Sequence, residues 1–503
     1  MPETPPWAPA APVSPRPESP RPCRLSDVRD GLNGVRGDPG ETWVTGITHD
    51  SRAVRPGDLY VALPGARAHG VDFAEEAVRS GAVALFTDEA GRDRAASTGV
   101  PVLTADDARA VLGTAARIVY GSPAAEMLVL GVTGTDGKTT TAYLLEAGLR
   151  AAGHITGLIG TVQTRIGTDV LPSVRTTPEA TDLQALLALM RERAVTAVAM
   201  EVSSHALALA RIDGVDVDVA AFTNLSQDHL DFHPTMADYE AAKARLFTPH
   251  LSRRGVTNVD DAAGRRLATA ARIPMTTYGA GGDWRAEDVE LRAAGSTFRL
   301  VGPGVEAVAS VQLPGSFNVA NAVCALVSLI VAGVPVADAV QGVAHCPGVP
   351  GRMERIDEGQ PFLAVVDYAH TPKAVATLLA AVRALTPGRV IVVLGCGGDR
   401  DRTKRGPMGA AAAAGSDLAL LTSDNPRSED PLAILAEMAA GAPQARVEPD
   451  RRTAIEIAVH EARPGDTVVV AGKGHETGQE TAGRIAPFDD REVLREALRS
   501  VAA

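Results

Sequence analysis

The sequence predicts an α/β protein with a small N-terminal α/β domain, a central doubly wound sheet and a C-terminal Rossmann-like sheet. Three observations lead to this prediction. A glycine-rich loop at residues 131–140 lies between an apolar run and a helical pattern. Four strand patterns in the last third of the chain each end in a polar loop. At 503 residues, the chain is long enough to build several well-formed cores.

Composition shifts mark the expected boundaries. Residues 1–22 are rich in Pro, Ala and Ser and predict a disordered tail. The N-terminal domain then covers residues 23–124 and the central domain residues 125–346. A Pro/Gly-rich connection, typical of a linker, follows Cys346, so the C-terminal domain covers residues 347–503.

Charge and cysteine usage narrow the class of protein. A formal charge of −12 argues against nonspecific nucleic-acid binding, which depends on Lys and Arg contacts to phosphates. The four cysteines show neither a paired nor a zinc-binding spacing, and this favours a reducing compartment. The sequence shows no signal-peptide pattern and no apolar run near the roughly 20 residues that span a bilayer. We therefore expect a cytoplasmic protein without nucleic-acid or membrane partners.

The N-terminal domain shows short strand and helix patterns. Residues 49–63 alternate apolar and polar side chains around a Pro-Gly turn, and a loop at 65–70 precedes a helical pattern at 73–80. Ser51 lies in this stretch, where a turn residue and a binding residue are equally compatible with the pattern.

The central domain opens with the loop at residues 131–140. Such a loop turns backbone N–H groups and a helix N-terminus toward one point, and Lys138 adds a positive charge there, so polyphosphate is the expected ligand. Thr139 follows, where a hydroxyl binds Mg²⁺. The loop is a variant, because Val132 stands where the general pattern has glycine.

Polar residues follow two further strand patterns of this domain. Residues 195–200 end at Glu201, and residues 218–222 lead to a loop that ends at His229. Ligands bind at the carboxyl edge of open α/β sheets, so Glu201 and His229 are candidate metal ligands beside the phosphate loop. The helical pattern at 236–247 carries Lys243, which on the pattern alone we expect to be exposed to solvent.

The C-terminal domain alternates strands with helices. Strand patterns at 362–366, 390–394, 418–421 and 467–470 each lead into a polar loop, which predicts a second doubly wound sheet. Charged side chains of both signs gather at its expected binding edge: Arg400, Asp424, Arg427 and Glu476. Such an edge is suited to a zwitterionic ligand.

These motifs together resemble those of the Mur ligase family, the ATP-dependent ligases that build the peptide of bacterial cell-wall precursors. The resemblance runs from about residue 45 to the C-terminus and includes these stretches: GTDGKTT at 134–140, EVSSH at 201–205, NLSQDH at 224–229, YEAAK at 239–243, GSFNVAN at 315–321, DYAH at 367–370, DNPR at 424–427 and GKGHE at 472–476.

The resemblance implies a role for individual residues. Catalytic roles fall to Lys138, Glu201, His229, Lys243 and His370. ATP contacts fall to Gly134, Thr135, Asp136, Gly137, Lys138, Thr139, Thr140, Asn321 and Arg352. Contacts with a uridine-nucleotide precursor fall to Ser51, Thr176, Thr177, Ser203 and Arg211, with the loop 66–68 near the UDP. Amino-acid contacts fall to Arg400, Asp424, Asn425, Pro426, Arg427, Gly472 and Glu476. Metal contacts fall to Thr139, Glu201, His229 and Lys243.

The resemblance also implies an activity. We expect an ADP-forming acid–amino-acid ligase that adds diaminopimelate, with the meso isomer as the family default, to UDP-N-acetylmuramoyl-L-alanyl-D-glutamate in peptidoglycan synthesis. Its expected requirements are ATP, two Mg²⁺ ions and CO₂ bound as a carbamate on Lys243, and we expect it to act as a monomer. Addition of L-lysine at the same step, attachment of a ready-made peptide, and a catalytically silent nucleotide-binding protein are the alternatives.

Two departures from the family pattern stand out. Asp136 occupies a position that is usually Asn, which places an anion near the triphosphate. His69 occupies a position that is often Asp, so the uridine contacts of its loop are less secure.

Overall fold

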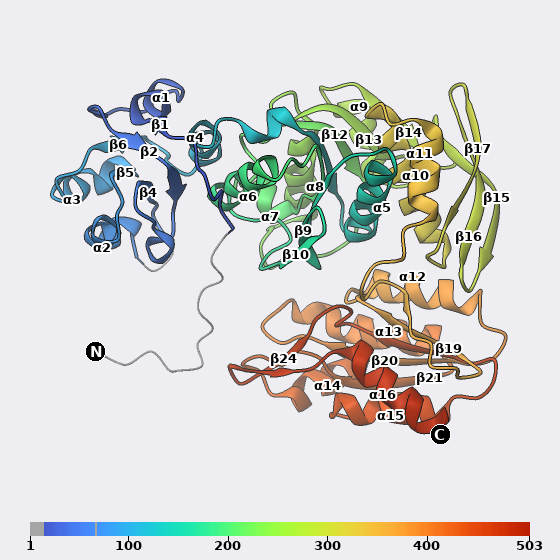
Figure 1. Ribbon diagram of the computed structural model, residues 1–503. Helices are drawn as coiled ribbons and strands as arrows, with labels where there is room; N and C mark the ends of the chain where they lie inside the picture. Colours follow the sequence, from blue (N-terminus) through green and yellow to red (C-terminus); the bar gives the residue numbers. More distant parts are fainter. Residues whose placement is uncertain (1–14, 66–67, 503) are drawn as a thin grey trace.

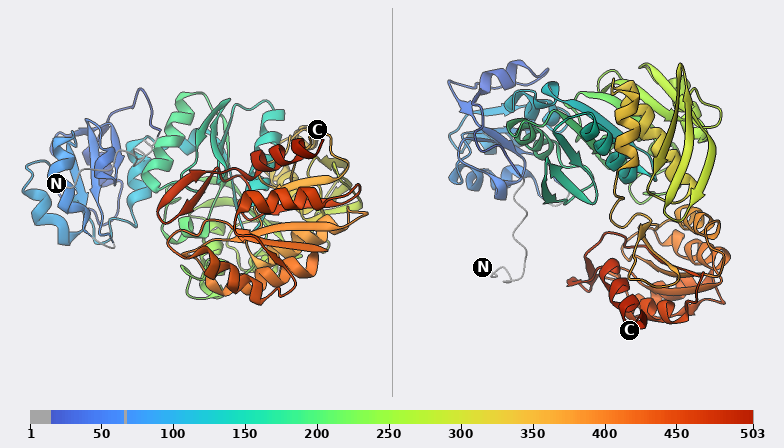
Figure 2. Two further views of the ribbon diagram at one scale, coloured as in Figure 1. Left: turned by 90° about the horizontal axis from the view of Figure 1, so that it is seen from below. Right: turned by 45° about the vertical axis from the view of Figure 1, so that its right-hand side comes forward.

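The computed structural model describes residues 15–65 and 68–502, and its mixed α/β architecture confirms the predicted fold class (Figure 1). The N-terminal and C-terminal domains lie against different sides of the central domain (Figure 2). Across the described residues, none of the helices is both long enough and apolar enough to cross a bilayer.

The N-terminal domain has a parallel sheet in the order β3-β4-β5-β6 and a two-stranded sheet of β1 and β2. Its elements are β1 (Cys23–Arg24), α1 (Leu25–Asp30), β2 (Trp43–Val44), β3 (Gly46–Thr48), η1 (Ser51–Ala53), β4 (Asp58–Ala62), η2 (Gly70–Phe73), α2 (Ala74–Arg79), β5 (Ala84–Thr87), η3 (Glu89–Gly91), α3 (Arg92–Ala96), β6 (Val102–Thr104), α4 (Leu112–Val119) and η4 (Pro123–Glu126). The helical pattern at 73–80 is thus a 3₁₀ turn followed by a short α-helix.

The expected disordered tail of residues 1–22 is wrong for residues 15–22. Arg16 forms a buried ion pair with Asp58 at 2.7 Å, which fixes this segment against the N-terminal domain. Residues 1–14 lie outside the described part of the chain.

The central domain has an eight-stranded sheet in the order β10-β9-β8-β11-β7-β12-β13-β14, parallel from β8 to β14. Its first elements are β7 (Leu128–Thr133), α5 (Lys138–Ala151), β8 (Thr156–Ile159), β9 (Gln163–Ile166), β10 (Asp169–Pro172), α6 (Ala180–Glu192), β11 (Ala197–Glu201), α7 (Ser204–Ala208), β12 (Val217–Phe222), α8 (Met236–Ala244) and η5 (Arg245–Phe247). The remaining ones are β13 (Ser252–Asn258), α9 (Ala262–Ala270), β14 (Met275–Tyr278), β15 (Arg285–Arg292), β16 (Gly295–Gly302), β17 (Val305–Val311), α10 (Ser316–Val331) and α11 (Val336–Ala344).

Both faces of this sheet are covered. Helices α5, α10 and α11 pack an apolar core on one face, and α6, α7 and α9 pack a second core on the other. Strands buried on both faces read as continuous apolar runs, as β11 does up to Glu201 and β12 does after Asp218. The antiparallel sheet β15-β16-β17 stands beside α10 and α11 (Figure 1).

The C-terminal domain has a six-stranded sheet in the order β18-β19-β23-β20-β21-β22 and a β24-β25 hairpin. Its elements are β18 (Glu354–Arg355), β19 (Leu363–Asp367), α12 (Pro372–Arg383), β20 (Val390–Cys396), η6 (Arg402–Lys404), α13 (Arg405–Gly415), β21 (Leu418–Ser423), α14 (Pro431–Ala440), β22 (Arg446–Val447), α15 (Arg451–Glu461), β23 (Thr467–Ala471), β24 (Gly478–Thr481), β25 (Arg484–Pro487) and α16 (Asp490–Ala502). Four of its sheet strands match the predicted strand patterns to within two residues at each end.

Candidate functional site

The phosphate loop connects β7 to α5. Gly137 has a φ of +83°, and a Cβ atom there would collide with the side chain of Asn321 from α10, so this position requires glycine. The ammonium of Lys138 donates to the carbonyl oxygens of Gly134 at 2.9 Å and Thr135 at 2.8 Å. The loop therefore brings a positive charge and the N-terminus of α5 to one point.

Asp136 does not point its carboxylate freely into the loop. Its Oδ2 accepts a hydrogen bond from the Ser226 hydroxyl at 3.2 Å, and its backbone N–H donates to Asn224 Oδ1 at 2.9 Å. Asn224 and Ser226 follow β12, so the loop after this strand holds Asp136 in place.

Glu201 ends β11 with its carboxylate buried beside the phosphate loop. Its Oε2 accepts from the Thr139 hydroxyl at 3.0 Å, and its Oε1 accepts from the Thr161 backbone at 2.7 Å. The hydroxyl and the carboxylate predicted to bind a metal therefore lie together at the carboxyl edge of the sheet.

Lys243 is buried, contrary to the expectation from its helical pattern. Thr235 caps α8, and from the last turn of this helix the Lys243 side chain passes the Tyr239 ring, at 4.4 Å from its centroid, to donate to the Gly134 carbonyl at 2.7 Å. Burial lowers the pKa of Lys243 well below its usual value, and the nearby charge of Lys138 lowers it further. Both effects favour the neutral amine of Lys243 over its ammonium form.

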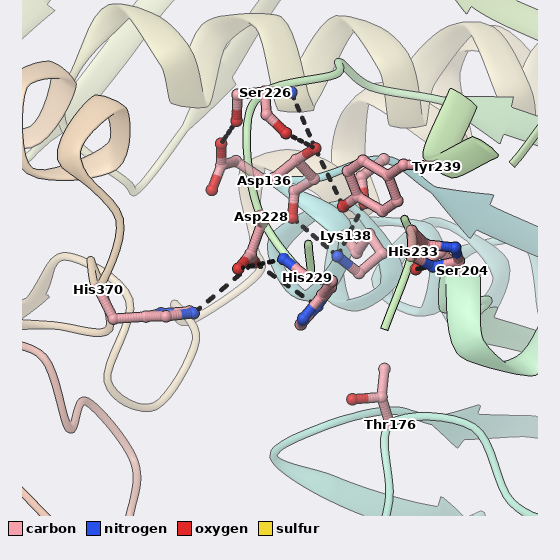
Figure 3. A network of polar contacts seen from close by, with 12 residues as sticks. Asp136, Lys138, Thr176, Ser204, Ser226, Asp228, His229, His233, Tyr239 and His370 are labelled. Carbon is pink, nitrogen blue, oxygen red and sulfur yellow. Dashed lines mark hydrogen bonds and ion pairs between the residues drawn. The ribbon is translucent and has the colours of Figure 1, made fainter. Parts of the chain in front are cut away.

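His229 lies in the loop after β12 with a φ of +55°. Burial lowers the pKa of His229 to about 4, so the ring is neutral and available as a ligand near pH 7. Asp228 Oδ2 lies 3.5 Å from His229 Nε2 and 4.0 Å from Nε2 of His370, which belongs to the C-terminal domain. Figure 3 shows both imidazoles turned toward this carboxylate.

The residues expected near the adenosine also meet at this place. Arg352 from the linker donates to the Thr139 hydroxyl at 3.1 Å and stacks over the Tyr368 ring at 4.4 Å. Asn321 lies against the phosphate loop from α10 and donates to Asn318 at 3.1 Å. A cavity of about 380 Å³ opens here, and its walls include the phosphate loop, Asn321, Arg352 and His370.

Four of the five residues predicted to bind the precursor cluster beside Glu201. Thr177 accepts from the Ser203 backbone at 3.1 Å, and Thr176 pairs with Thr161 at 3.0 Å. Arg211 forms an ion pair with Glu179 at 2.7 Å and approaches the Thr177 carbonyl at 3.5 Å.

Ser51 lies apart from these four, in η1 of the N-terminal domain. His49 Nδ1, two residues earlier, lies 2.9 Å from the Thr181 hydroxyl of the central domain. His69 caps η2, because its Nδ1 accepts from the Val71 backbone at 3.1 Å while Nε2 faces Asp88. Residues 66 and 67 of the expected nucleotide loop lie outside the described residues.

The predicted amino-acid residues converge at the carboxyl edge of the C-terminal sheet. Asn425 donates to Glu476 Oε2 at 2.7 Å, and Asp424 lies beside Gly472, whose φ is +113°. Pro426, which lies between Asn425 and Arg427 in the chain, is buried. Arg400 is exposed on the loop after β20.

Arg427 has a left-handed backbone with a φ of +55° and donates to the Gly398 carbonyl at 2.6 Å. The β24-β25 hairpin holds this conformation, since Arg427 N–H donates to the Glu480 carbonyl at 3.0 Å. The Arg427 side chain is partly exposed, and its Nε lies 3.6 Å from Glu480 Oε2.

Lys473 was not predicted from the sequence. Its fully buried ammonium donates to Glu476 Oε2 at 3.1 Å, Asn425 Oδ1 at 3.1 Å and the Gly478 carbonyl at 2.7 Å. The glycines on either side of it, in the stretch GKGHE, were the available signal. Asp228 was likewise missed as an individual site residue.

The central and C-terminal groups face one opening. A cavity of about 420 Å³ is lined by Thr161 and Ser173 of the central domain and by Asn425, Glu476 and Ile485 of the C-terminal domain. Thr161 also binds Glu201, so the phosphate site and the zwitterion site border a shared space.

Three family models match the chain: the Mur ligase family catalytic domain over residues 44–120, the Mur ligase middle domain over 132–329, and the Mur ligase glutamate ligase domain over 351–474.

Two bacterial proteins are similar over most of their length. A protein of Streptomyces coelicolor named UDP-N-acetylmuramoyl-L-alanyl-D-glutamate--2,6-diaminopimelate ligase is 59% identical over 469 residues, covering 91% of this chain and 92% of that protein. A protein of the same name from Corynebacterium glutamicum is 49% identical over 478 residues, covering 91% of this chain and 92% of that protein. A solved structure of a ligase of that name is 34% identical, with a TM-score of 0.65, and covers 92% of this chain and 96% of that chain.

Proposed function

Since this chain belongs to the Mur ligase family, we propose that it joins 2,6-diaminopimelate to UDP-N-acetylmuramoyl-L-alanyl-D-glutamate at the expense of ATP. The enzyme is an ATP-dependent amide-bond ligase of peptidoglycan synthesis. The observation that carries the proposal is that Thr161 lines both the cavity at the phosphate loop and the opening that Asn425 and Glu476 of the C-terminal domain line.

The phosphate loop supplies the first requirement of the reaction. The precursor's carboxylate must attack the γ-phosphate of ATP, and two anions approach one another only where cations neutralise them. Lys138 and the N–H groups at the start of α5 provide positive charge at the loop, and Arg352 adds a guanidinium next to Thr139. ADP leaves when the carboxylate oxygen bonds to phosphorus, and an acyl phosphate remains.

The residues present fit Mg²⁺ only together with other oxygen donors. Within the described residues, no three His, Cys, Asp or Glu side chains converge as a self-sufficient metal site. Thr139, Glu201 and His229 would hold Mg²⁺ together with nucleotide oxygens, which is the usual way proteins bind this ion. Two Mg²⁺ ions, when bound, would neutralise the phosphates and the attacking carboxylate.

Lys243 fits this site as a carbamate. An ammonium would repel Mg²⁺, but the lowered pKa of Lys243 favours its neutral amine, which can attack CO₂ and lose one proton to give an anion. The side chain already reaches the Gly134 carbonyl at 2.7 Å, so the carbamate would form at the phosphate loop.

The second step forms the amide. The diaminopimelate amine attacks the acyl carbon, the C–O bond to phosphate breaks, and the amine gives up a proton. His370 and Asp228 lie on opposite sides of the domain boundary, and we assign His370 to this end of the site, where an imidazole paired with a carboxylate accepts a proton. Closing the opening between the domains would exclude the water that hydrolyses acyl phosphates.

The C-terminal pocket selects the amino acid. Diaminopimelate differs from lysine by a distal carboxylate, and Arg427 can meet this group with two parallel hydrogen bonds. Glu476 and Asp424 accept hydrogen bonds from the adjacent ammonium, and Asn425 and Arg400 bind the remaining polar groups of the amino acid. The meso isomer is the expected substrate.

A product assay tests the proposal. The purified protein is incubated with ATP, the UDP-dipeptide precursor and either diaminopimelate or L-lysine, and the product mass and ADP release are measured. We expect the diaminopimelate product and stoichiometric ADP. Comparable kcat/KM values for the two amino acids, or a product only with a preformed peptide, would overturn the assignment. We propose that the reaction takes place in the cytoplasm, where ATP is available, and that the enzyme acts as a monomer.

A further inference from the structure

Residues 15–19 lie along the boundary between the N-terminal and central domains, where α4 and α6 pack together (Figure 1). They precede the region that matches the Mur ligase models. Their contacts were not expected from their composition. Two sets of hydrogen bonds, one to each domain, hold them in place.

Arg16 makes the contacts with the N-terminal domain. Its Nη1 donates to both oxygens of Asp58, at 2.9 and 2.7 Å, and its Nη2 donates to the Ala53 carbonyl at 3.1 Å. The side chains of Arg16 and Asp58 are 7% and 2% exposed. Buried charge-assisted bonds of this geometry are the strong ones among protein hydrogen bonds.

Glu192, the last residue of α6, makes the contacts with the central domain. Its carboxylate accepts from the backbone N–H of Glu18 and of Ser19, both at 2.8 Å. Arg193 adds an ion pair to Glu18 at 3.5 Å. The two anchors are thus only two residues apart along the chain.

The Arg16 anchor acts on one turn of the N-terminal domain. Ala53 closes η1, which begins at Ser51 and is capped by Asp50, and Asp58 also accepts from the Arg55 backbone at 2.8 Å. Arg16 therefore joins the end of η1, at Ala53, to the start of β4, at Asp58. η1 contains Ser51, to which the family resemblance assigns a contact with the uridine-nucleotide precursor.

We propose that residues 15–19 form a strap between the two domains and that Arg16 is a positioning residue for the precursor. The strap holds the turn at Ser51 at a fixed place relative to the central domain, so that the uridine end and the D-glutamate end of one substrate molecule are bound together. The inference rests on the proposed function, because it takes the precursor as the ligand of this turn.

The experiment compares Arg16→Ala with Arg21→Ala, which removes an exposed arginine two residues beyond the strap. We expect Arg16→Ala to raise KM for the UDP-dipeptide precursor about tenfold, since small misplacements of binding groups are costly. KM for ATP, kcat and all constants of Arg21→Ala should change by less than about twofold. Arg16→Lys, which keeps the charge on Asp58, should recover part of the loss.

Glu192→Gln tests the other anchor and remains informative if Arg16→Ala does not fold. It should raise the precursor KM about threefold, because an amide accepts these N–H bonds more weakly than a carboxylate. An unchanged precursor KM in both variants, or an equal rise in the KM for ATP, would overturn the strap. A lowered melting temperature with unchanged KM would assign these contacts to stability alone. Failure of the wild-type protein to make product would instead refute the proposed function. Calorimetric measurement of precursor affinity in the same variants tests the strap without turnover.

Discussion

Two lysines show how differently the central and C-terminal domains build their sites. Lys243 is 1% exposed and Lys473 is 0% exposed, so both hold an amine out of water. Lys473 meets the carboxylate of Glu476 and two further acceptors. Lys243 meets the Gly134 carbonyl and, among the described residues, forms no ion pair with a carboxylate.

The difference separates a complete site from an incomplete one. A carboxylate partner stabilises the charged form of a buried ammonium. Burial beside another cation instead favours loss of the proton to give the neutral amine. The C-terminal pocket is therefore preformed by the chain itself. Under the proposed function, the central site would acquire its full charge balance only with groups that the chain does not encode: CO₂, metal ions and nucleotide.

The largest expected effect concerns the preformed pocket. Wild-type enzyme should prefer diaminopimelate to lysine by roughly 10⁴-fold, because lysine lacks the distal carboxylate that the Arg427 guanidinium would bind. Arg427→Ala should abolish this preference, chiefly through lost kcat/KM with diaminopimelate. Arg484→Ala, which removes an exposed arginine from the neighbouring hairpin, should retain it. A preference that survives Arg427→Ala would show that specificity resides elsewhere.

A slightly smaller effect is expected at the incomplete site. Lys243→Ala should lower kcat by about 10³-fold, since a charged group at the reacting phosphates is lost, and added formate or acetate should restore part of the activity by replacing the carbamate. Lys138→Ala should lose similar activity without rescue, because it removes a cation.

Carbamate formation also predicts a dependence on CO₂ and pH. Protonation of Lys243 blocks attack on CO₂, so activity in CO₂-depleted buffer should recover on adding bicarbonate, and recovery should weaken as the pH falls toward the lowered pKa of Lys243. An unmodified Lys243 beside bound ATP and Mg²⁺ in a crystal structure would falsify the carbamate.

The third effect compares how much each of the two buried lysines contributes to the free energy of unfolding. Lys473→Met leaves Glu476 without its buried partner and should lower the free energy of unfolding by about 2 kcal/mol, less than for a fully buried pair because the Glu476 side chain is 30% exposed. Lys243→Met removes an amine without a carboxylate partner and should leave stability equal or higher in CO₂-free buffer. Thermal unfolding of both variants measures the difference, and equal destabilisation would contradict it.

Sequence patterns predicted the parts of the molecule that depend on local order. Continuous apolar strands followed by polar residues indicated both doubly wound sheets and brought Glu201, His229, Asp424 and Glu476 to sheet edges. The side chains at those edges then converged as the topology requires.

The remaining features depend on contacts between distant segments. The burial of Lys243 arises because α8 packs over the phosphate loop, about a hundred residues earlier in the chain. The pairing of Asp228 with His370 crosses a domain boundary. The Arg16 anchor joins a Pro-rich segment to β4, and no periodic pattern signals such a bond.

The smallest expected effect lies at the precursor cluster, which combines features of both sites. Arg211 has a carboxylate partner, Glu179, yet its Nε is buried without a hydrogen-bond partner among the described residues. Burial lowers the pKa of Arg211, although Glu179 opposes this shift.

Because Glu179 already offsets part of the Arg211 charge, Arg211→Ala should raise KM for the UDP-dipeptide precursor by about tenfold, which corresponds to the loss of one charge-assisted hydrogen bond. KM for ATP should change by less than about twofold. Arg175→Ala is the matched variant, since Arg175 also pairs with Glu179 but its side chain is half exposed. If Arg211 contacts the precursor directly, Arg175→Ala should have little effect on the same constant. An equal rise in the precursor KM in the two variants would show that the charge on Glu179, rather than a contact from Arg211, governs precursor binding. An equal rise of the KM for the precursor and for ATP in Arg211→Ala would show that Arg211 serves only as a structural ion pair.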